Sequence, residues 1–363
     1  MYSLETGNYT ANEIREMLTS DREVWYEYEL LDKNNIPLGK VTATGSIDYN
    51  ATAKIQRTAQ LEVVEANEIN FASDKIKPVM CLNTPKGVEK FPLGVFFLCS
   101  PQRQASTGSI RRSIECYDMT LQIIDDKFTS RYKISAGTLY TSAIQAILSS
   151  AGISDAIVTA SDKLLQTDIE YPVGMEKIDA VNQLLKAINY NNIYANQNGK
   201  LVCDPYENPL TRTIEASYAT DKKSIIFSGV REELDIFKVP NKVVRYLDTA
   251  DRATLIAEAS NTDPSSILSI PSRGRTIVDV APVNDIADQG TLNNYTQRIL
   301  EDYKIYQRII VDTAAMPNHG NLDCLYIIDN ELDIVGKYIE EAWHLDMSLG
   351  GHMTHTARKV MSL

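Results

Sequence analysis

The sequence predicts an α+β protein that is mainly β, in which two β-rich regions flank a small α/β segment. Three observations predict this organisation. Apolar and polar residues alternate from about residue 24 to 126, the apolar spacing becomes helical between about 143 and 188, and alternation returns after about 211. A length of 363 residues is comfortable for two or three domains. We expect three domains, formed by residues 1–127, 128–208 and 209–363.

The first region is predicted to begin with a short helix and to continue as strands. Thr10 and Glu13 have the spacing of a capping box, in which each side chain satisfies a backbone N–H of the other residue. Alternation starts at Val24, and the polar residues 32–35 supply the turn that ends this strand. Further strands, at a spacing typical of a β-barrel, are expected at residues 59–63, 79–82, 94–99 and 113–117.

The middle region is predicted to contain two helices. The first covers residues 143–151, and Gly152 stands where a C-terminal cap belongs. The second covers residues 178–188 and is expected to end at residues 191–192.

A hairpin is expected to follow over residues 193–203. Its Asn198–Gly199 pair favours a two-residue turn in which both residues have positive φ. The middle region is therefore interpreted as a small α/β insert.

The last region is predicted to return to strands and to contain one helix. Residues 261–290 include three prolines and are expected to form extended loops. A helix is expected over residues 291–304, and the chain is expected to end in a hairpin that turns at Gly350 and Gly351. The other expected strands cover residues 224–227, 242–247, 254–259, 307–314 and 325–328.

The overall chemistry argues against several classes of protein. A net charge of −12 repels phosphate backbones, so we expect no specific binding of nucleic acid. Five dispersed cysteines without a CxxC pair argue against a disulfide framework or a thiolate zinc site, and we expect buried free thiols. No signal peptide and no apolar stretch of the ~18–20 residues that cross a bilayer are present. We therefore expect a soluble protein without membrane insertion.

All four histidines lie late in the chain, and they are the best candidates for a metal site. His352 and His355 are three residues apart on a predicted strand, so they should point to opposite faces. His344 and His352 lie on opposite arms of the last hairpin and could meet across it. A zinc site would also need a third ligand and groups that orient the ligands, and neither is evident. Surface or interface positions are the expectation for all four, including His319.

No catalytic pattern is present. The sequence contains no GxSxG, P-loop, HExxH or GxGxxG motif. Glu232–Glu233 and Glu340–Glu341 are sequence neighbours, so on strands their side chains diverge, and a solvated acidic face is the simpler interpretation. We therefore assign no catalytic, cofactor-binding or metal-binding residue, and we expect neither a cofactor nor an enzyme activity.

Several stretches resemble the baseplate hub family of phages and tailocins, especially hubs of contractile tails of the Gram-positive type. The resemblance covers nearly the whole chain as a pattern of strands and turns. It rests on residues 76–78, on FPLGVFFL at 91–98, on IECYD at 114–118, on 134–140 with the helix to Gly152, on Asn189–Tyr190, and on WHLD at 343–346 with Gly350–Gly351 and 353–360.

The resemblance implies both a fold and a role. In such hubs each subunit has two tail-tube-like β-barrel domains, here on either side of a small α/β insert. Three subunits form a pseudo-hexameric ring that adapts the six-fold tail tube to the three-fold central spike.

The same resemblance implies partners and a location. The partners are two further copies of the chain, a tail tube or distal tail protein above, a central spike or tail lysozyme protein below, and further a tape measure protein and the baseplate wedge. The location is the baseplate of a virion or tailocin tail, assembled in the cytoplasm of the bacterial host.

Two other interpretations remain open. A tail-associated cell-wall hydrolase would need a cleft with converging carboxylates or a Cys–His pair. A carbohydrate-binding module would need exposed, coplanar aromatic side chains. The chain has 19 tyrosines, which suit protein interfaces and sugar platforms equally well.

Overall fold

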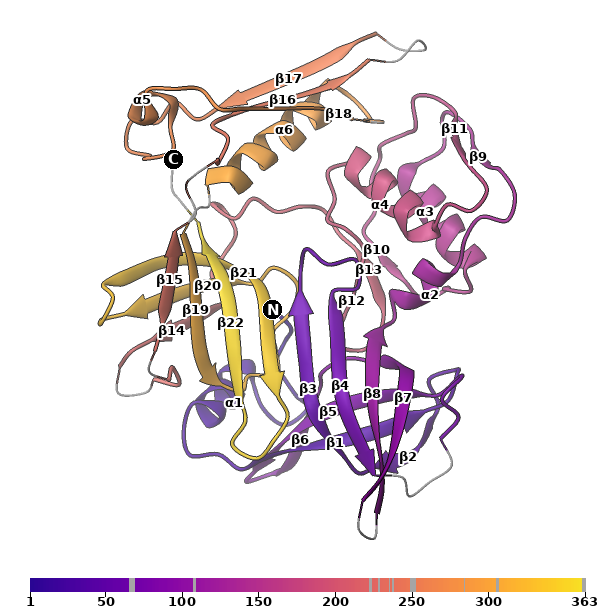
Figure 1. The fold of residues 1–363 in the computed structure, drawn as a ribbon, viewed down its shortest axis with the longest axis vertical. Coiled ribbons are helices and arrows are strands. Elements are labelled where there is room, and N and C mark those ends of the chain that lie inside the picture. Colours follow the sequence, from indigo (N-terminus) through magenta and orange to yellow (C-terminus); the bar gives the residue numbers. More distant parts are fainter. Residues whose placement is uncertain are drawn as a thin grey trace.

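The protein is mainly β, as predicted (Figure 1). The computed structural model describes residues 1–64, 69–106, 109–221, 224–227, 229–234, 236, 238–248, 253–283, 285–304 and 307–360. A large curved sheet forms the lower half of the molecule in Figure 1. A helical segment lies above it on one side, and a small sheet with a long helix lies at the top.

In its described residues, the first β-rich region contains one helix and eight strands. Helix α1 (Ala11–Leu18) starts with the predicted capping box: the N–H of Glu13 donates to Thr10 Oγ1, and the N–H of Thr10 donates to the Glu13 carboxylate. Every predicted strand of this region is present, and β2, β3 and β6 are additional. The strands are β1 (Val24–Leu31), β2 (Pro37–Val41), β3 (Ala43–Asn50), β4 (Arg57–Val64), β5 (Lys75–Thr84), β6 (Gly87–Pro92), β7 (Phe96–Ser106) and β8 (Ser109–Asp118).

The second β-rich region belongs to the same fourteen-stranded sheet. Burial alternates strictly along β19, as expected for a strand with one face on a core. Residues 224–227, predicted as a strand, make only an isolated bridge from Ile226 to Thr313. The strands are β14 (Ala216–Ala219), β15 (Arg231–Leu234), β19 (Gln307–Ala314), β20 (Cys324–Asp329), β21 (Ile334–Asp346) and β22 (His352–Lys359).

The two β-rich regions are joined by backbone pairing between β21 and β3. The main strand order is β15-β19-β22-β21-β3-β4-β8-β7-β5-β1-β2, with β14 and β20 branching from β21 and with β6 branching from β5. In the described part of the chain, these ladders do not close either region into a barrel. The strands instead share one hydrophobic core, which also takes in Ile14 and Leu18 of α1.

The α/β segment has its own hydrophobic core, to which two helices contribute their apolar faces. Helix α3 (Tyr140–Ser150) is followed by Gly152 with φ 76°, as predicted. Helix α4 (Lys177–Ala187) ends earlier than predicted, because Asn189 already adopts φ 57°. The remaining elements are α2 (Leu121–Asp125), β9 (Tyr132–Ile134), β10 (Ile157–Val158), β11 (Ile169–Tyr171), β12 (Tyr194–Ala195) and β13 (Leu201–Cys203).

The turn between β12 and β13 differs from the prediction. Gly199 has φ 76°, but Asn198 does not adopt positive φ. The backbone N–H of Asn196 donates to Lys200 O, and the Asn196 side-chain oxygen accepts the N–H groups of Asn198 and Lys200 at 3.0 Å. The loop is therefore three residues long with glycine at the left-handed position, because the Asn196 side chain closes it one residue earlier.

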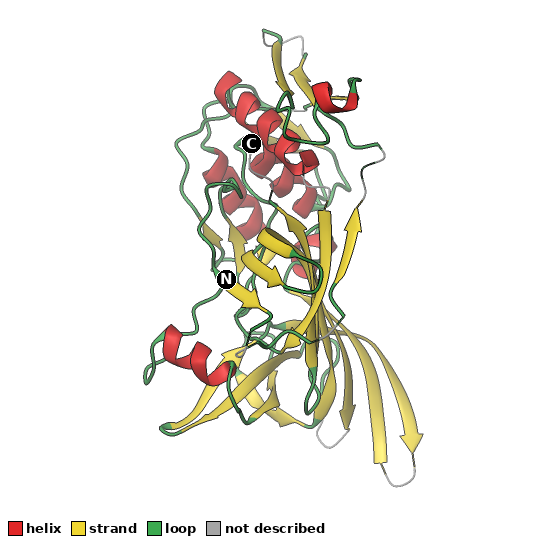
Figure 2. Ribbon diagram, turned by 90° about the vertical axis from the view of Figure 1, so that its left-hand side faces the viewer, coloured by secondary structure: helices red, strands yellow, loops and turns green. Residues whose placement is uncertain are grey.

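A third layer covers the top of the molecule. Strand β16 (Lys242–Leu247) pairs with β17 (Leu255–Ser260) and, in parallel, with β18 (Val278–Pro282). Residues 261–290 were predicted as loops, yet they contain β18 and the short helix α5 (Ile270–Arg273). Helix α6 (Gln289–Lys304), which was predicted, packs on one face of this sheet, and Figure 2 shows it close to the helices of the α/β segment.

Direct contacts tie this top layer to the α/β segment. The Tyr140 hydroxyl hydrogen bonds to Asp285, and Lys163 pairs with Asp288. The N–H of Ala287 donates to the carbonyl of Ala187 at 3.2 Å. The boundaries at residues 127 and 208 remain a prediction.

Gly45 lies on β3, where a side chain has no room. A Cβ at this position would collide with the backbone carbonyl of Gln60 on the paired strand β4. We expect Gly45→Ala to lower the free energy of unfolding by about 1–3 kcal/mol, because the two strands must separate locally. Chemical denaturation followed by circular dichroism measures the effect. Gly7→Ala, where no atom lies within 4 Å, is the control, and equal stability of the two variants would contradict the expectation.

Candidate functional site

The junction between β21 and β3 organises the centre of the molecule. Five residue pairs are in register, from Ala342 with Asn50 to Asp346 with Ser46. On the core side, Trp343 stacks on Tyr49 with ring centroids 5.5 Å apart. The sheet therefore continues from one β-rich region into the other without a break in its packing.

The opposite face of the junction is polar. A cross-strand row runs through Thr58, Asp48, His344, Thr354 and Asp312 on five adjacent strands. His344 Nδ1 lies 2.7 Å from Asp48 Oδ1, and the Thr354 hydroxyl donates to Asp312. Because these side chains are polar, this face of the sheet can contact water.

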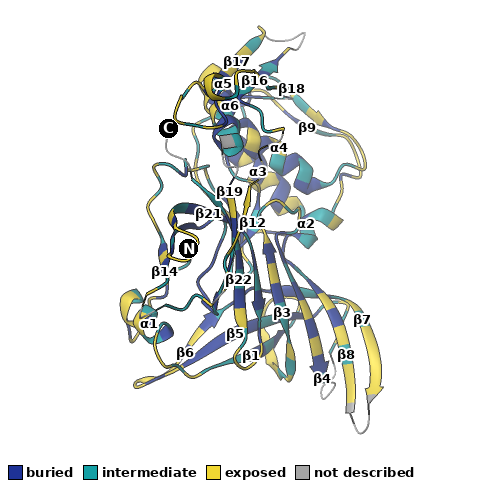
Figure 3. Ribbon diagram, turned by 60° about the vertical axis from the view of Figure 1, so that its left-hand side comes forward, coloured by how far each residue is buried: buried dark blue, intermediate teal, exposed yellow. Residues whose placement is uncertain are grey.

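Several strands of the sheet have a partner on one side only, among them β15 and the outer part of β7. Strand β7 pairs with β5 only at Phe96 and Phe97, so from Leu98 onward its described pairing is to β8 alone. The β7–β8 hairpin projects from the sheet as an exposed arm (Figure 3). At the other end of the sheet, β15 pairs with β19 alone, and all four of its residues are exposed. Unpaired strand edges are templates for pairing with another chain.

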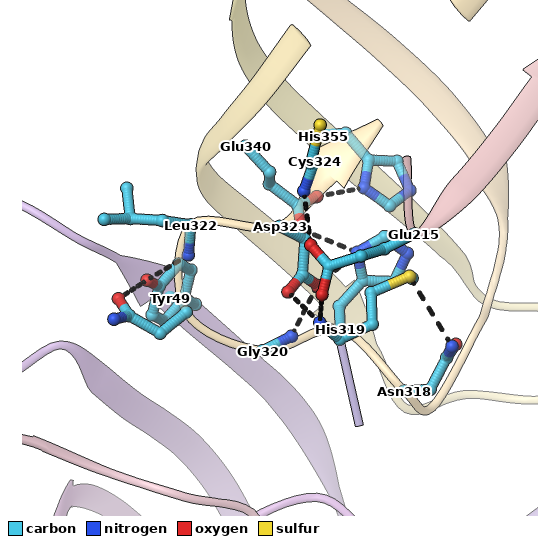
Figure 4. A network of polar contacts seen from close by, with 12 residues as sticks. Tyr49, Glu215, Asn318, His319, Gly320, Leu322, Asp323, Cys324, Glu340 and His355 are labelled. Atoms are coloured by element: carbon cyan, nitrogen blue, oxygen red, sulfur yellow. Dashed lines mark hydrogen bonds and ion pairs between the residues drawn. The ribbon is translucent and has the colours of Figure 1, made fainter. Parts of the chain in front are cut away.

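A buried cluster of His319, Glu340 and His355 lies near this junction (Figure 4). His319 belongs to the segment between β19 and β20, Glu340 to β21, and His355 to β22. Nδ1 of His319 lies 2.6 Å from Glu340 Oε2, and Nδ1 of His355 lies 2.5 Å from Glu340 Oε1. All three residues are at most 2% exposed. One carboxylate is thus held between two imidazoles.

The outer nitrogens of both imidazoles contact hydroxyl groups. Nε2 of His319 lies 2.7 Å from the Tyr218 hydroxyl, and Nε2 of His355 lies 2.8 Å from Thr313 Oγ1. These contacts hold each ring with its Nδ1 atom turned toward Glu340.

A second buried carboxylate extends the network. Asp323 Oδ2 lies 3.5 Å from His319 Nδ1 and accepts the N–H of Gly320 at 2.7 Å. Its other oxygen lies 2.7 Å from the amino nitrogen of Met1, which also contacts Glu215.

Mutual interaction shifts the pKa values in the cluster. Burial alone would raise the pKa of the Glu340 carboxyl, but the two imidazoles outweigh burial and lower it to about 2. Burial lowers the pKa of His319, but the Glu340 carboxylate outweighs this effect and the net shift is upward. For His355 burial prevails over the same carboxylate, and its pKa is lowered. Glu340 is therefore the ionised centre of the cluster.

Two of the four histidines do not lie at the surface or interface positions that were expected from the sequence. His319 and His355 are buried, and Glu340 is the third group that was not evident in the sequence. The prediction that His352 and His355 face opposite ways is confirmed, because His352 is exposed. His344 and His352 do not pair across the hairpin, since His344 lies opposite Thr354.

The acidic pair Glu340–Glu341 shows the divergence predicted for neighbouring strand residues, but not the predicted solvation. Glu340 faces the two imidazoles, whereas Glu341 faces Arg308 and Arg358 on the other side of β21. Both are buried, and the ladder with β22 has a β-bulge between Glu340 and Ala342. The exposed pair Glu232–Glu233 on β15 does fit a solvated face.

A cavity of about 820 Å³ lies between the N-terminal residues, the α/β segment, α6 and β22. Its carboxylates include Glu207 and Glu215, which both pair with Arg212. Arg298 in the same wall lies over the Tyr206 ring, with its guanidinium carbon 3.9 Å from the ring centroid. The described lining contains neither cysteine nor histidine, so it offers no Cys–His nucleophile pair.

The cysteines are free thiols, as predicted, and all but the half-buried Cys99 are buried. Burial raises the pKa of Cys81 to about 11 and that of Cys203 to about 12. Thiols with raised pKa values are poor nucleophiles at neutral pH. No helix in the described part of the chain is long and apolar enough to cross a membrane.

Removing the charge of Glu340 tests how far the structure depends on the buried cluster. We expect Glu340→Gln to lower the free energy of unfolding by about 3–5 kcal/mol, because one partner of a buried charged network is lost. Glu62→Gln, which removes a half-exposed partner of Arg111, should cost less than about 1 kcal/mol. Urea denaturation of both variants provides the comparison. A Glu340→Gln protein as stable as Glu62→Gln would contradict the expectation.

Comparison with known proteins places the fold. No protein-family model matches the sequence, and no curated protein sequence is detectably similar to it. Among solved structures, a tail protein from Neisseria meningitidis MC58 is similar with a TM-score of 0.67 at 13% identity, over 92% of this chain and 97% of that protein. The 43 kDa tail protein of prophage MuSo2 from Shewanella oneidensis has a TM-score of 0.62 at 12% identity, over 92% and 98% of the two chains.

A third solved structure extends the comparison. Prophage tail protein gp18 from Listeria monocytogenes EGD-e is similar with a TM-score of 0.57 at 11% identity, over 93% of this chain and 95% of that protein. All three similarities cover almost the full length of both chains, so they concern the whole arrangement of layers. The chain therefore has the fold of phage tail proteins, and the resemblance to hub proteins of phage baseplates is confirmed at the level of the fold.

Proposed function

We propose that the protein is a structural baseplate hub subunit of a phage-like contractile tail, of the type found in Gram-positive systems. The observation that carries the proposal is the continuous sheet in which β15, at one end of the strand order, and the part of β7 beyond Phe97 each lack a partner on one side. Such a sheet is complete only when a neighbouring chain covers its edges. The likeness to three tail proteins over more than nine-tenths of the chain supports the same role.

The two edges differ, which favours a ring. If β15 of one copy pairs with β7 of the next, the contact is head-to-tail, and repeated head-to-tail contacts close into a ring when the rotation fits. Four strands lie on each side of the β21–β3 junction, from β21 to β15 and from β3 to β7. Each chain would thus supply two similar four-stranded units. Three chains would supply six, which is the pseudo-hexameric arrangement that the resemblance implies.

The proposed ring has a polar inner surface. The row through Asp48, His344 and Thr354 lies on the face of the junction opposite the core. Arg111 and Glu62 pair on adjacent strands β8 and β4. A hydrated wall with paired charges suits a channel through which other molecules pass. The two β-rich regions, residues 1–127 and 209–363, would serve as the two tail-tube-like domains of each subunit.

The proposed partners follow from this position in the tail. They are two further copies of the chain, a tail tube or distal tail protein above, and a central spike or tail lysozyme protein below, with a tape measure protein and the baseplate wedge nearby. One further similar structure is a Francisella PdpA–VgrG complex, with a TM-score of 0.56 at 12% identity, over 97% of this chain and 56% of that one. The proposed location is the baseplate of a virion or tailocin tail.

We expect the purified protein to form trimers, alone or after addition of its spike protein. Light scattering coupled to gel filtration measures the mass, and one chain has a mass of 40.6 kDa. A protein that stays monomeric at every concentration and with every tail partner would contradict the ring.

Shortening the β7–β8 arm tests the proposed edge contact. Replacement of residues 103–112 by an Asn-Gly turn keeps the pairing of Gln102 with Ser113 but removes the exposed edge beyond it. We expect this variant to keep its circular dichroism spectrum and to lose trimerisation. Gln104→Ser, which leaves the arm in place, should still assemble. Normal trimers of the shortened protein would show that the arm is not the contact.

We also propose that the protein has no enzymatic activity of its own. The cavity carboxylates Glu207 and Glu215 are paired with Arg212, and Cys81 and Cys203 have raised pKa values. Zymography on bacterial cell wall should therefore show no clearing by the purified protein. Clearing that disappears in a substitution of a cavity residue would identify a hydrolase instead.

A further inference from the structure

We propose that His319, Glu340, His355 and Asp323 form a structural site for a divalent transition-metal ion, of which Zn²⁺ is the best match. The candidate ligand atoms of His319, Glu340 and His355 all lie within 4.8 Å of one another. Two imidazoles and carboxylates are a ligand set that zinc accepts in tetrahedral sites. The proposal concerns the stability of the chain and does not depend on the role in a tail.

The convergence of two imidazoles on one buried carboxylate is the strongest reason for a metal ion. Nδ1 of His319 and Nδ1 of His355 lie 2.6 Å and 2.5 Å from the two oxygens of Glu340. All three side chains are shielded from solvent.

Nitrogen and oxygen atoms that can bind a cation are thus gathered at one point in the core. A cation among them would bind both Nδ1 atoms and the Glu340 carboxylate at the same time.

The surroundings of both histidines match those of metal ligands. A ligating imidazole commonly donates its other N–H to an oxygen acceptor, which fixes the ring and its tautomer. Tyr218 and Thr313 supply such oxygens for His319 and His355. These contacts leave both Nδ1 atoms directed toward Glu340 (Figure 4).

Asp323 supplies the fourth ligand. Its Oδ2 atom lies 3.5 Å from His319 Nδ1, and the N–H of Gly320 holds this oxygen in place at 2.7 Å. Four protein ligands with no exposed group make a closed site, which is typical of structural zinc. Mg²⁺ and Ca²⁺ prefer sites of oxygen ligands alone, so two imidazoles argue against them.

The site needs only a small adjustment to accept the ion. Bonds of about 2.0–2.2 Å in a tetrahedron place ligand atoms about 3.3 Å apart. The two short nitrogen–oxygen contacts must therefore widen by less than about 1 Å. The ion would connect the segment between β19 and β20 to strands β21 and β22, and it would hold that segment in the core.

The test begins with the metal content of the untagged full-length protein. Because the site is buried, the protein is also refolded from urea with excess Zn²⁺ and then freed of unbound metal by gel filtration. Mass spectrometry of the elements should find about one zinc per chain. A folded protein without zinc after both procedures would overturn the proposal.

Substitutions assign the metal to this site. His319→Gln and His355→Gln should lose the zinc, while His344→Gln and His352→Gln, which change histidines outside the cluster, should keep it. Retention of zinc by both cluster variants would overturn the proposal, as would its loss from the two controls.

Two measurements on the unaltered sequence keep the proposal testable if the cluster variants fail to fold. Refolding with Co²⁺ should produce the visible absorption of a tetrahedral site with nitrogen and oxygen ligands. A chelator present during refolding should lower the midpoint of thermal unfolding by several degrees, since the ion binds the folded chain and not the unfolded chain. A featureless cobalt spectrum together with an unchanged midpoint would overturn the proposal.

Discussion

The pairing of β21 with β3 is the constraint on which the rest of the structure depends. It joins residues about three hundred positions apart in the sequence, and it makes one sheet from two regions that would each present an open edge. Because side chains alternate along strands, this register decides which residues meet in the core and which face water. It places Trp343 on Tyr49 and, on the adjacent strand β22, fixes the side of the sheet on which His355 lies.

Sequence patterns predicted a helix or a cap well where the signal comes from residues that are close together in the sequence. The capping box of Thr10 and Glu13, the cap at Gly152 and the helix α6 all depend on residues within a few positions of one another. The turn at Asn198–Gly199 failed for an equally local reason, because the side chain of Asn196 competes for the same backbone groups. Strand β18 was missed because three prolines in its neighbourhood suggested loops, although Pro282 lies at its end, where a strand tolerates it.

The buried cluster could not be predicted, because its members are brought together only by tertiary structure. The spacing of His352 and His355 correctly separated the exposed histidine from the other, but no spacing relates His319 to Glu340. Glu340 and Glu341 look alike in the sequence, and the β-bulge of β21 gives each its own set of partners. Glu340 and Glu341 were interpreted from the sequence as solvated charges, whereas the structure buries both of them.

The same junction has a consequence for synthesis. Strand β3 leaves the ribosome long before its neighbour β21, because about three hundred residues separate the two strands. Until then the hydrogen-bonding groups along one side of β3 have no native partner, and contacts of such long sequence separation form slowly. A nascent chain interrupted before residue 334 would therefore expose the unpaired backbone groups of β3 to other chains, and molecular chaperones are the natural protection against such contacts.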